Sequence, residues 1–228
     1  MMNKQRRILF ICGSMNQTTM MVKIAEQLPH HDCWFTPHYT DGVVGLLERA
    51  GCLEWTIVGS RHQRRAAEYL RSRNLQIDNR GAQYEYDLVV TCSDLFVQKN
   101  VRKSRVILVQ EGMTDPETLM FHLVRALNLP RYLASTSTFG LSECYAKMCV
   151  ASEGYRDLFI KKGVDPSKLV VTGIPNFDNC ESLMQSPFPM SGFVLVATSD
   201  ARETFKYENR RATIKEALQI AKGRKLVF

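Results

Sequence analysis

Residues 148–178 read MCVASEGYRDLFIKKGVDPSKLVVTGIPNFD, in which two short apolar runs flank one amphipathic segment. The runs at 148–151 and 169–172 predict buried strands. Between them Ser152 and Glu153 form an acidic turn, apolar residues recur at helical spacing, and Gly163 predicts the end of the helix. Two strands joined through a helix need a crossover connection, so we expect a parallel pair in an α/β sheet.

The same alternation extends toward the N-terminus. Short apolar runs predict further strands at 7–12, 55–59, 87–92 and 105–110. Helical spacing predicts helices at 20–28, 43–50, 63–72 and 116–127. Thr18 or Thr19 is expected to cap the first of these helices, and Asp115 the last, which would open at Pro116. We therefore predict an α/β fold, a Rossmann-like parallel sheet with helices on both faces.

A linker divides the chain. Residues 186–192 read SPFPMSG, and two prolines among small residues favour an extended connection. The prediction is a domain at 1–185 and a further segment at 193–228, with strands at 193–198 and 225–228 around a helix at 212–221. Such a segment cannot close a sheet by itself. It is either the start of a truncated second Rossmann-like domain or an addition that docks onto the first domain.

Composition favours a soluble, cytoplasmic protein. The chain has 228 residues, 45% of them hydrophobic, and its apolar runs are of strand length. They are far shorter than the ~20 residues that span a bilayer, so we expect neither a signal peptide nor a membrane span. The seven cysteines show no CxxC spacing, which indicates reduced thiols.

The formal net charge of the chain is +7 at pH 7, which suggests an anionic partner or a basic solvent-exposed face. Basic residues concentrate in 61–73 and again in 99–105. For the first run a solvated helix face is one interpretation, and peripheral contact with the anionic inner face of a membrane is the other. Aromatic interleaving, an RNP-like segment and zinc spacing are all missing from the sequence, which argues against nucleic acid as a partner.

The turn after the first strand is a candidate binding site. Gly13, Ser14 and Asn16 stand between a strand and a helix, where a helix N-terminus can hold an anion or a sugar hydroxyl. The turn lacks both the GxGxxG spacing and the Gly-Lys-Ser/Thr ending, which argues against a dinucleotide or NTPase loop. A plain capped turn uses the same residue types and stays an alternative.

Two carboxylates follow strands. Asp94 comes just after the strand at 87–92, and Glu111 comes at the end of the strand at 105–110, before Gly112, which would let the backbone turn. The carboxyl ends of parallel strands line the ligand crevice, so the two acids could share general acid/base work. The alternative is that Asp94 caps a turn and Glu111 pairs with a nearby base.

Residues 6–180, and 153–178 most specifically, resemble the N-terminal domain of two-domain nucleotide-sugar enzymes of GT-B type. The group includes UDP-N-acetylglucosamine 2-epimerases, glycosyltransferases and polyol-phosphate transferases. In the epimerases one strand ends in Gly-Asp and the next in His-x-Glu-Ala-Gly. Here the corresponding residues are 92–94 (CSD) and 109–112 (VQEG), so Asp94 and Glu111 match both acids while Val109 replaces the histidine.

The resemblance implies a glycosyltransferase that moves a sugar, or a polyol phosphate, from a nucleotide-activated donor to an acceptor. Asp94 and Glu111 would be catalytic. The expected substrate-binding residues are Gly13, Ser14, Asn16, Gly112, Glu153, Gly173 and Asn176. Because the donor would bind a C-terminal domain of which only the start is present, this chain alone is expected to be inactive. The alternatives are a UDP-N-acetylglucosamine 2-epimerase and a non-catalytic binding module derived from such an enzyme.

We expect no metal and no cofactor, with the nucleotide-sugar acting as substrate. Enzymes of GT-B type neutralise the leaving diphosphate with helix N-termini and basic residues, and the chain has no Asp-x-Asp pair. Its five histidines are too scattered along the sequence to indicate a metal site. The sequence does not decide whether the protein forms a homodimer.

Overall fold

The computed structural model describes residues 5–38, 40–54, 59–95, 97–184, 188–198 and 209–228. The chain forms two compact units, the first running to Asp178 and the second from Asn179 to Phe228. The first unit thus ends earlier than the domain boundary predicted at 185. Most of the strand predicted at 55–59 and the start of the linker predicted at 186–192 lie outside the described residues.

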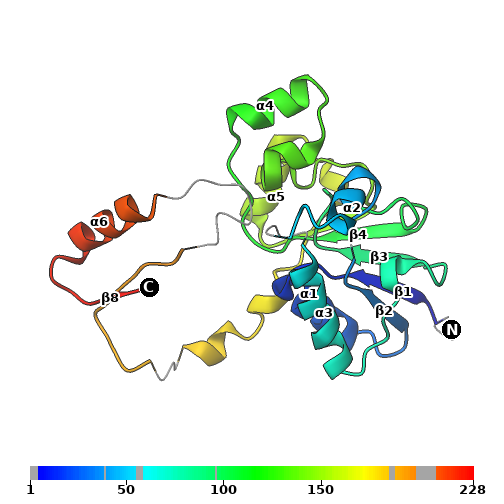
Figure 1. Cartoon of the computed structure of the whole chain (residues 1–228), viewed down its shortest axis with the longest axis horizontal. Coiled ribbons are helices and arrows are strands. Elements are labelled where there is room, and N and C mark those ends of the chain that lie inside the picture. The colour runs from blue at the N-terminus through cyan, green and yellow to red at the C-terminus, as the bar shows by residue number, and fades with distance from the viewer. Residues whose placement is uncertain (1–4, 39, 55–58, 96, 185–187, 199–208) are drawn as a thin grey trace. The chain divides into compact units, whose positions relative to one another are not determined.

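The first unit is built on a parallel sheet, as predicted (Figure 1). Its six strands are ordered β2-β1-β3-β4-β5-β6. Their bounds are β1 Arg7–Ile11, β2 Asp32–Thr36, β3 Leu88–Thr91, β4 Arg105–Val109, β5 Lys147–Val150 and β6 Leu169–Val171. All five neighbouring pairs are parallel. The α/β, Rossmann-like fold class is therefore confirmed.

A short segment extends the sheet beyond β2. Ile77 forms a parallel bridge with Phe35, whose N–H donates to the Gln76 carbonyl oxygen at 2.9 Å. The chain then turns through the 3₁₀ helix η1 (Asn79–Gly81). With this segment counted as a strand, the spatial order becomes that of a doubly wound α/β sheet, in which the order reverses between β1 and β3.

Alternating strand residues form two cores. Leu9 and Ile11 belong to the core that contains Phe139 and Phe159, whereas Ile8 and Phe10 belong to the core packed under α1 and α3. The helices are α1 Met15–Glu26, α2 Gly42–Arg49, α3 Ser60–Ser72 and α5 Glu153–Lys162. Helices α1 and α3 thus cover one face of the sheet and α5 covers the other, as expected for strands buried on both sides.

The stretch at 148–178 folds as predicted. Helix α5 begins after Ser152, whose side chain accepts a hydrogen bond from the Tyr155 N–H, and ends at Gly163 with φ of 103°. That left-handed conformation favours glycine. The 3₁₀ helices η3 (Pro166–Lys168) and η4 (Pro175–Phe177) precede and follow β6.

Three predicted details are wrong. Strand β2 was missed, because DCWFT is only partly buried and lacks a continuous apolar run. Helix α4 spans Leu119–Ala126 with Thr118 at its N-cap, so Pro116 lies outside it. Asp115 does not cap that helix: its carboxylate accepts a 2.8 Å hydrogen bond from Thr136 in the 3₁₀ segment η2 (Arg131–Thr138).

The second unit contains one βαβ element. Strands β7 (Val194–Leu195) and β8 (Leu226–Val227) pair in parallel on either side of α6 (Arg210–Ala221), close to the predicted order. The 3₁₀ helix η5 (Cys180–Leu183) precedes them. All seven cysteines are free thiols. Across the described ranges, every helix is too short or too polar to cross a bilayer.

Candidate functional site

The Glu111 carboxylate is the centre of a polar cluster at the carboxyl edge of the sheet. One carboxylate oxygen accepts hydrogen bonds from Asn16 Nδ2 at 2.9 Å and from Ser14 Oγ at 3.3 Å. The other accepts from Gln17 Nε2 at 2.6 Å. Because three donors from one helix turn converge on it, the carboxylate is held in a single orientation while it stays partly open to solvent.

Helix α1 explains where these donors come from. Ser14 is its N-cap, accepting a hydrogen bond from the Gln17 N–H at 3.2 Å, while the Gln17 side chain accepts from the Ser14 N–H in a capping box. The prediction that Thr18 or Thr19 caps this helix is therefore wrong. The first turn of a helix carries partial positive charge and favours an anion, and the side chain of Glu111 supplies one.

Asn176, which follows β6, joins the cluster. Its Nδ2 donates to Asn16 Oδ1 at 2.8 Å and to the Asn16 carbonyl oxygen at 2.9 Å. Nearby, Lys23 Nζ donates to the Pro175 carbonyl oxygen at 3.1 Å. The structure thus brings together Ser14, Asn16, Glu111 and Asn176, four of the site residues that the sequence predicts.

Three residues around Glu111 were missed by the sequence analysis. Gln17 could have been found, since Ser-x-x-Gln before a helix is a capping-box signal. Gln110 is buried and links β4 to β5, donating to the Gly112 carbonyl oxygen at 2.8 Å and accepting from the Ala151 N–H at 2.9 Å. Burial, reinforced by the charge of Glu111, raises the pKa of the Cys92 thiol, which marks it as an unreactive neighbour.

Asp94 belongs to a separate network. Its side chain is buried and accepts hydrogen bonds from Arg131 Nη1 at 2.7 Å, from the Ser142 N–H at 3.0 Å and from the Gly140 N–H at 3.1 Å. Among the described contacts, Asp94 and Glu111 share no hydrogen-bond partner. These contacts show that the Asp94 carboxylate holds a loop, and a shared catalytic role for the two acids at this edge of the sheet stays a prediction.

Among the described contacts, the remaining predicted residues make no hydrogen bond to the Glu111 carboxylate. Glu153 starts α5 and pairs with Arg156 at 3.2 Å on the surface. Gly13 is buried between β1 and α1, and Gly173 has φ of 82° in the turn after β6. Gly112 was expected to permit a sharp turn, but its φ lies outside the left-handed region, so glycine is not required there.

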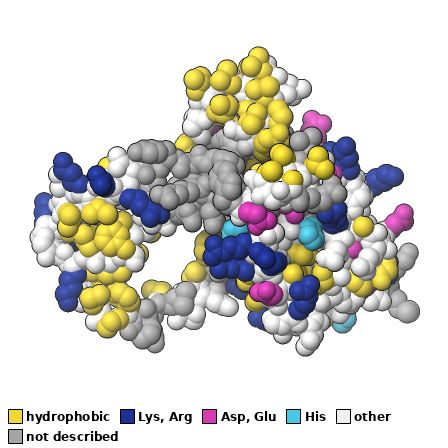
Figure 2. All heavy atoms as spheres, viewed as in Figure 1, with side chains coloured by type: hydrophobic (Ala, Val, Ile, Leu, Met, Phe, Trp, Pro, Cys, Tyr) yellow, Lys and Arg dark blue, Asp and Glu magenta, His cyan; other side chains and the backbone are white. Residues whose placement is uncertain are grey.

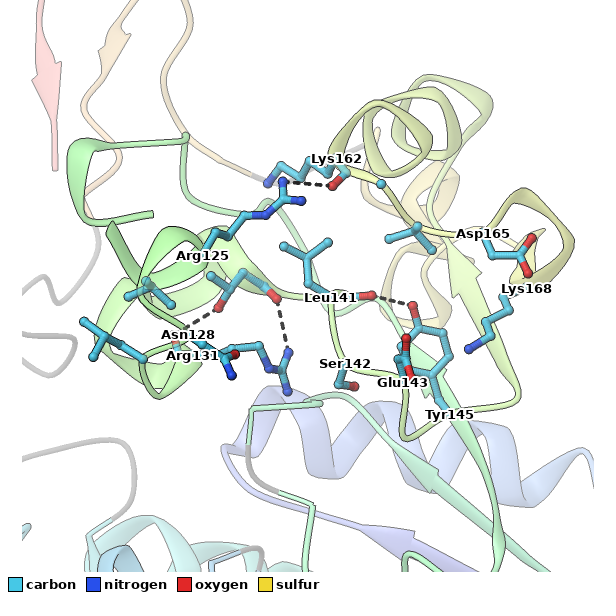
Figure 3. A pocket seen from close by; sticks show the side chains of 16 residues that line it. Arg125, Asn128, Arg131, Leu141, Ser142, Glu143, Tyr145, Lys162, Asp165 and Lys168 are labelled. Carbon is cyan, nitrogen blue, oxygen red and sulfur yellow. Dashed lines mark hydrogen bonds between the residues drawn. The ribbon is translucent and has the colours of Figure 1, made fainter. Parts of the chain in front are cut away.

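A cavity of 370 Å³ lies elsewhere in the first unit (Figure 3). Its walls come from the end of α4, from η2 and the loop after it, and from the turn between α5 and β6. Four cationic side chains line it, together with two acidic ones: Arg125, Arg131, Lys162, Lys168, Glu143 and Asp165. Since Tyr145 lies two residues before β5 and Lys168 directly precedes β6, part of the cavity wall lies at the amino ends of these strands.

Comparison with known protein families finds no family that matches, and comparison with curated proteins finds no relative. Among solved structures, the chain is similar to the crystal structure of Alr3699/HepE from Anabaena in complex with UDP and glucose. The two are 13% identical with a TM-score of 0.48, over 98% of this chain and 69% of that one. A likeness at this level assigns neither a ligand nor a reaction.

Proposed function

We propose that this protein is a nucleotide-sugar-dependent glycosyltransferase of GT-B type whose first unit binds the acceptor. The observation that carries the proposal is the oriented Glu111 carboxylate at the carboxyl edge of a doubly wound parallel sheet. Ligands of such sheets bind outside the carboxyl ends of the strands, which is where this cluster lies.

The chemistry of the cluster favours a hydroxyl over a phosphate. Its groups are a carboxylate, three amides and a hydroxyl, which bind sugar hydroxyls well, whereas the charge of Glu111 repels a phosphate. In the proposed reaction Glu111 accepts the proton of an acceptor hydroxyl as the hydroxyl oxygen attacks the anomeric carbon of the donor. The bond from that carbon to the nucleoside diphosphate breaks, and the diphosphate leaves with the electron pair.

The proposal also covers partners and cofactors. The donor is a nucleotide-sugar and no metal takes part; the diphosphate would be held by a donor-side domain that begins in the second unit. Among the described residues, no three His, Cys, Asp or Glu side chains form a group that could hold a metal ion. A cytoplasmic location and a homodimer remain part of the proposal.

An epimerase of the UDP-N-acetylglucosamine type is less well supported. In that reaction Asp94 and Glu111 would both act on one sugar, but Arg131 and two main-chain N–H groups occupy the Asp94 carboxylate. A non-catalytic binding module would use the same polar cluster as the transferase. The activity of Glu111 variants distinguishes the transferase from the binding module.

The test is Glu111→Gln in the full-length protein, with Glu26→Gln as the matched control. Loss of the general base should lower the rate of transfer by ~10²–10⁴-fold while the circular dichroism spectrum stays unchanged. Glu26 lies exposed at the end of α1 opposite the cluster and pairs with Arg73 at 3.4 Å, so its variant should keep the wild-type rate. Near-full turnover by Glu111→Gln, with an unchanged pH profile, would show that Glu111 is a structural acid.

Binding supplies a second test on the 228-residue chain. Neutral saccharides should bind at the Glu111 cluster, and saturation-transfer NMR would detect them. UDP should bind weakly or not at all, because the cluster carries a negative charge and the first unit is assigned to the acceptor. Micromolar affinity for UDP, measured by calorimetry on this chain alone, would contradict that assignment.

A further inference from the structure

Another cavity of the first unit lies at the carboxyl edge of the sheet, and we call it the edge cavity. Its volume is 250 Å³, and its walls come from the loops that follow β2, the Ile77 segment and β3. The polar side chains that line it include Asp41, Arg80, Gln98 and Asn100. None of the Glu111 cluster belongs to this lining. The cavity nevertheless lies at the edge where open parallel sheets bind their ligands.

Gln98 brings an unfavourable feature to the edge cavity. The residue is 2% exposed, and its side-chain oxygen Oε1 accepts no hydrogen bond. A buried acceptor without a partner costs the folded state free energy, whereas a leucine of similar size would not. Because the last torsion of a glutamine side chain is soft, a turn of the amide can bring this oxygen to a donor inside the cavity.

Arg80 brings a second unfavourable feature. Its φ is 67°, a left-handed conformation that glycine or asparagine adopts at a lower cost. The main chain is held there because the Arg80 N–H donates to Thr36 Oγ1 and Asn100 Nδ2 donates to the Arg80 carbonyl oxygen, both at 3.0 Å. Among the described residues the guanidinium group has no hydrogen-bond partner, so its donors are available to a ligand. Backbone strain of this kind gathers at functional sites.

Asp41 completes the polar lining. It is the N-cap residue of α2, but its side chain does not cap the helix. One carboxylate oxygen accepts instead from the Lys99 N–H at 2.6 Å, and the described contacts give the other oxygen no partner. Asn100 Nδ2 also donates to the Gly81 carbonyl oxygen at 2.8 Å. These bonds tie the three loops to one another, so the cavity is formed before a ligand enters it.

The chemistry of the lining favours hydroxyl groups over an ion. Asp41 is the acid of the lining and Arg80 is its cation, so their formal charges cancel. Figure 2 likewise shows acidic and basic side chains interspersed over the part of the first unit around α2 and α3. The groups without partners are acceptors on Gln98 and Asp41 and donors on Arg80. A ligand with neighbouring hydroxyls satisfies both kinds, because each hydroxyl donates one hydrogen bond and accepts two.

We propose that the edge cavity binds a sugar unit through its hydroxyls. Gln98 and Asp41 accept hydrogen bonds from the sugar, and the guanidinium group of Arg80 donates to it. The ligand is either a free sugar or one unit of a longer saccharide. In the second case the acceptor is an oligosaccharide, which rests on the proposed transferase function. Sugar binding in the cavity does not rest on it, because Glu111 takes no part.

Thermal unfolding tests whether the two unfavourable features serve a ligand. Gln98→Leu removes the buried acceptor and Arg80→Asn relieves the left-handed strain, so each should leave the Tm unchanged or raise it. The same two variants should bind sugar less well than the wild type. A clear decrease in Tm in both variants would show that these side chains support the fold, and it would overturn the proposal.

Amide NMR of the whole chain locates the binding. Titration with methyl glycosides of glucose, galactose, mannose and N-acetylglucosamine should shift the signals of Gly42 and Gly45, which line the edge cavity. Gln98→Leu should weaken this binding by about 2–10-fold, because it removes one neutral hydrogen bond. Arg80→Asn should weaken it by about 10–100-fold, because the donor that it removes is charged.

Matched controls change the same residue types away from the edge cavity. Gln27→Leu lies at the exposed C-cap of α1, and Arg105→Asn lies exposed at the amino end of β4. Both controls should bind the methyl glycosides as tightly as the wild type does. Equal weakening in a control and in its cavity variant would contradict the assignment of the site.

Longer sugars separate the two sources of the ligand. Cellotriose, maltotriose or chitotriose that binds more tightly than the methyl glycosides, and also shifts the Gly112 amide beside Glu111, would identify a unit of the acceptor. Equal affinity with an unchanged Gly112 signal would identify a free sugar. Glu111→Gln should keep the shifts at Gly42 and Gly45 in both cases, so a failure of the proposed reaction would not remove them.

Three results would refute sugar binding in the edge cavity. The first is the absence of a shift at Gly42 and Gly45 with every one of these sugars. The second is a shift at Gly112 alone, which would leave the Glu111 cluster as the place where sugars bind. The third is a response to glycine or glutamate but to none of the sugars, which would assign the cavity to a zwitterion.

Discussion

Replacing Asp94 by alanine should destabilise the first unit strongly. The Asp94 carboxylate is buried, and it joins the end of β3 to Arg131 and to the main chain at Gly140 and Ser142. Alanine removes the acceptor for two main-chain N–H groups and the counter-ion of one guanidinium at the same time. The loop from η2 to β5, which covers one face of the sheet, would lose its principal polar anchor.

The magnitude follows from these contacts. Each buried N–H group left without an acceptor costs about 1–3 kcal/mol, and breaking a buried ion pair by removing one partner costs about 3–5 kcal/mol. The Arg131 side chain keeps 27% of its exposure, so water compensates part of the loss. We therefore expect a decrease of about 3–5 kcal/mol in the free energy of unfolding, and about 6–20 °C in Tm.

Urea denaturation followed by circular dichroism measures this change. Asp94→Asn keeps one carbonyl oxygen as an acceptor and should lose less, about 1–3 kcal/mol. Glu153→Gln, which breaks a pair on the surface, should change the free energy by less than about 0.5 kcal/mol. An Asp94→Ala protein that is as stable as the wild type would refute the structural assignment. If such a protein also lost transfer activity, Asp94 would have to be returned to the catalytic residues.

Three further predictions concern single positions. Gly140→Ala should lower the free energy of unfolding by about 2–4 kcal/mol, because φ is 80° there and a Cβ would lie 3.1 Å from Met148 Cε. Thermal unfolding measures this change, and an unchanged Tm would contradict it. Gly112→Ala should leave Tm within about 2 °C of the wild type, because a Cβ there meets nothing within 4 Å; a large decrease would mean that glycine is needed after all. Burial would raise the pKa of Asp32, but hydrogen bonds from Arg7 and Trp34 outweigh it and hold that pKa below its ordinary value. Asp32 therefore stabilises the fold above its unfolded pKa, and this stabilisation is lost as the pH falls through the lower folded pKa. Asp32→Asn should make the loss of stability in acid less steep. An acid titration as steep as that of the wild type would disprove this.

Much of the sheet could be predicted because its central strands are continuous apolar runs. The β1 segment is apolar at every position from Ile8 to Ile11, and these four residues are all buried. Strand β2 was not predicted because it is only partly buried. Its sequence therefore mixes Asp32 and Cys33 with aromatic residues and lacks a continuous apolar run. The bridge at Ile77 is shorter still and has no sequence period to find.

The Glu111 cluster was largely predictable, since it follows from the geometry of parallel strands. Residues after β1, β4 and β6 must meet at one edge, and this brings Ser14, Glu111 and Asn176 together. Glu111 lies two residues after Val109, the last residue of β4, whose side chain packs in the core under α1, so the alternation of the strand directs Glu111 toward α1 as well. Asp94 lies three residues beyond the end of β3, in a loop whose direction no strand period sets.

The sequence by itself determined most of the alternation of strands and helices, the parallel arrangement of the central strands and the edge at which the polar residues gather, because these depend on local periodicity and on the handedness of crossovers. Tertiary packing alone decided that Asp94 holds a loop through Arg131 and that Gln17 joins Glu111. It also decided that the leucines of α4 lie exposed beside a cation-lined cavity. Those contacts join residues far apart in the chain, and their side-chain directions are fixed only when the helices pack on the sheet.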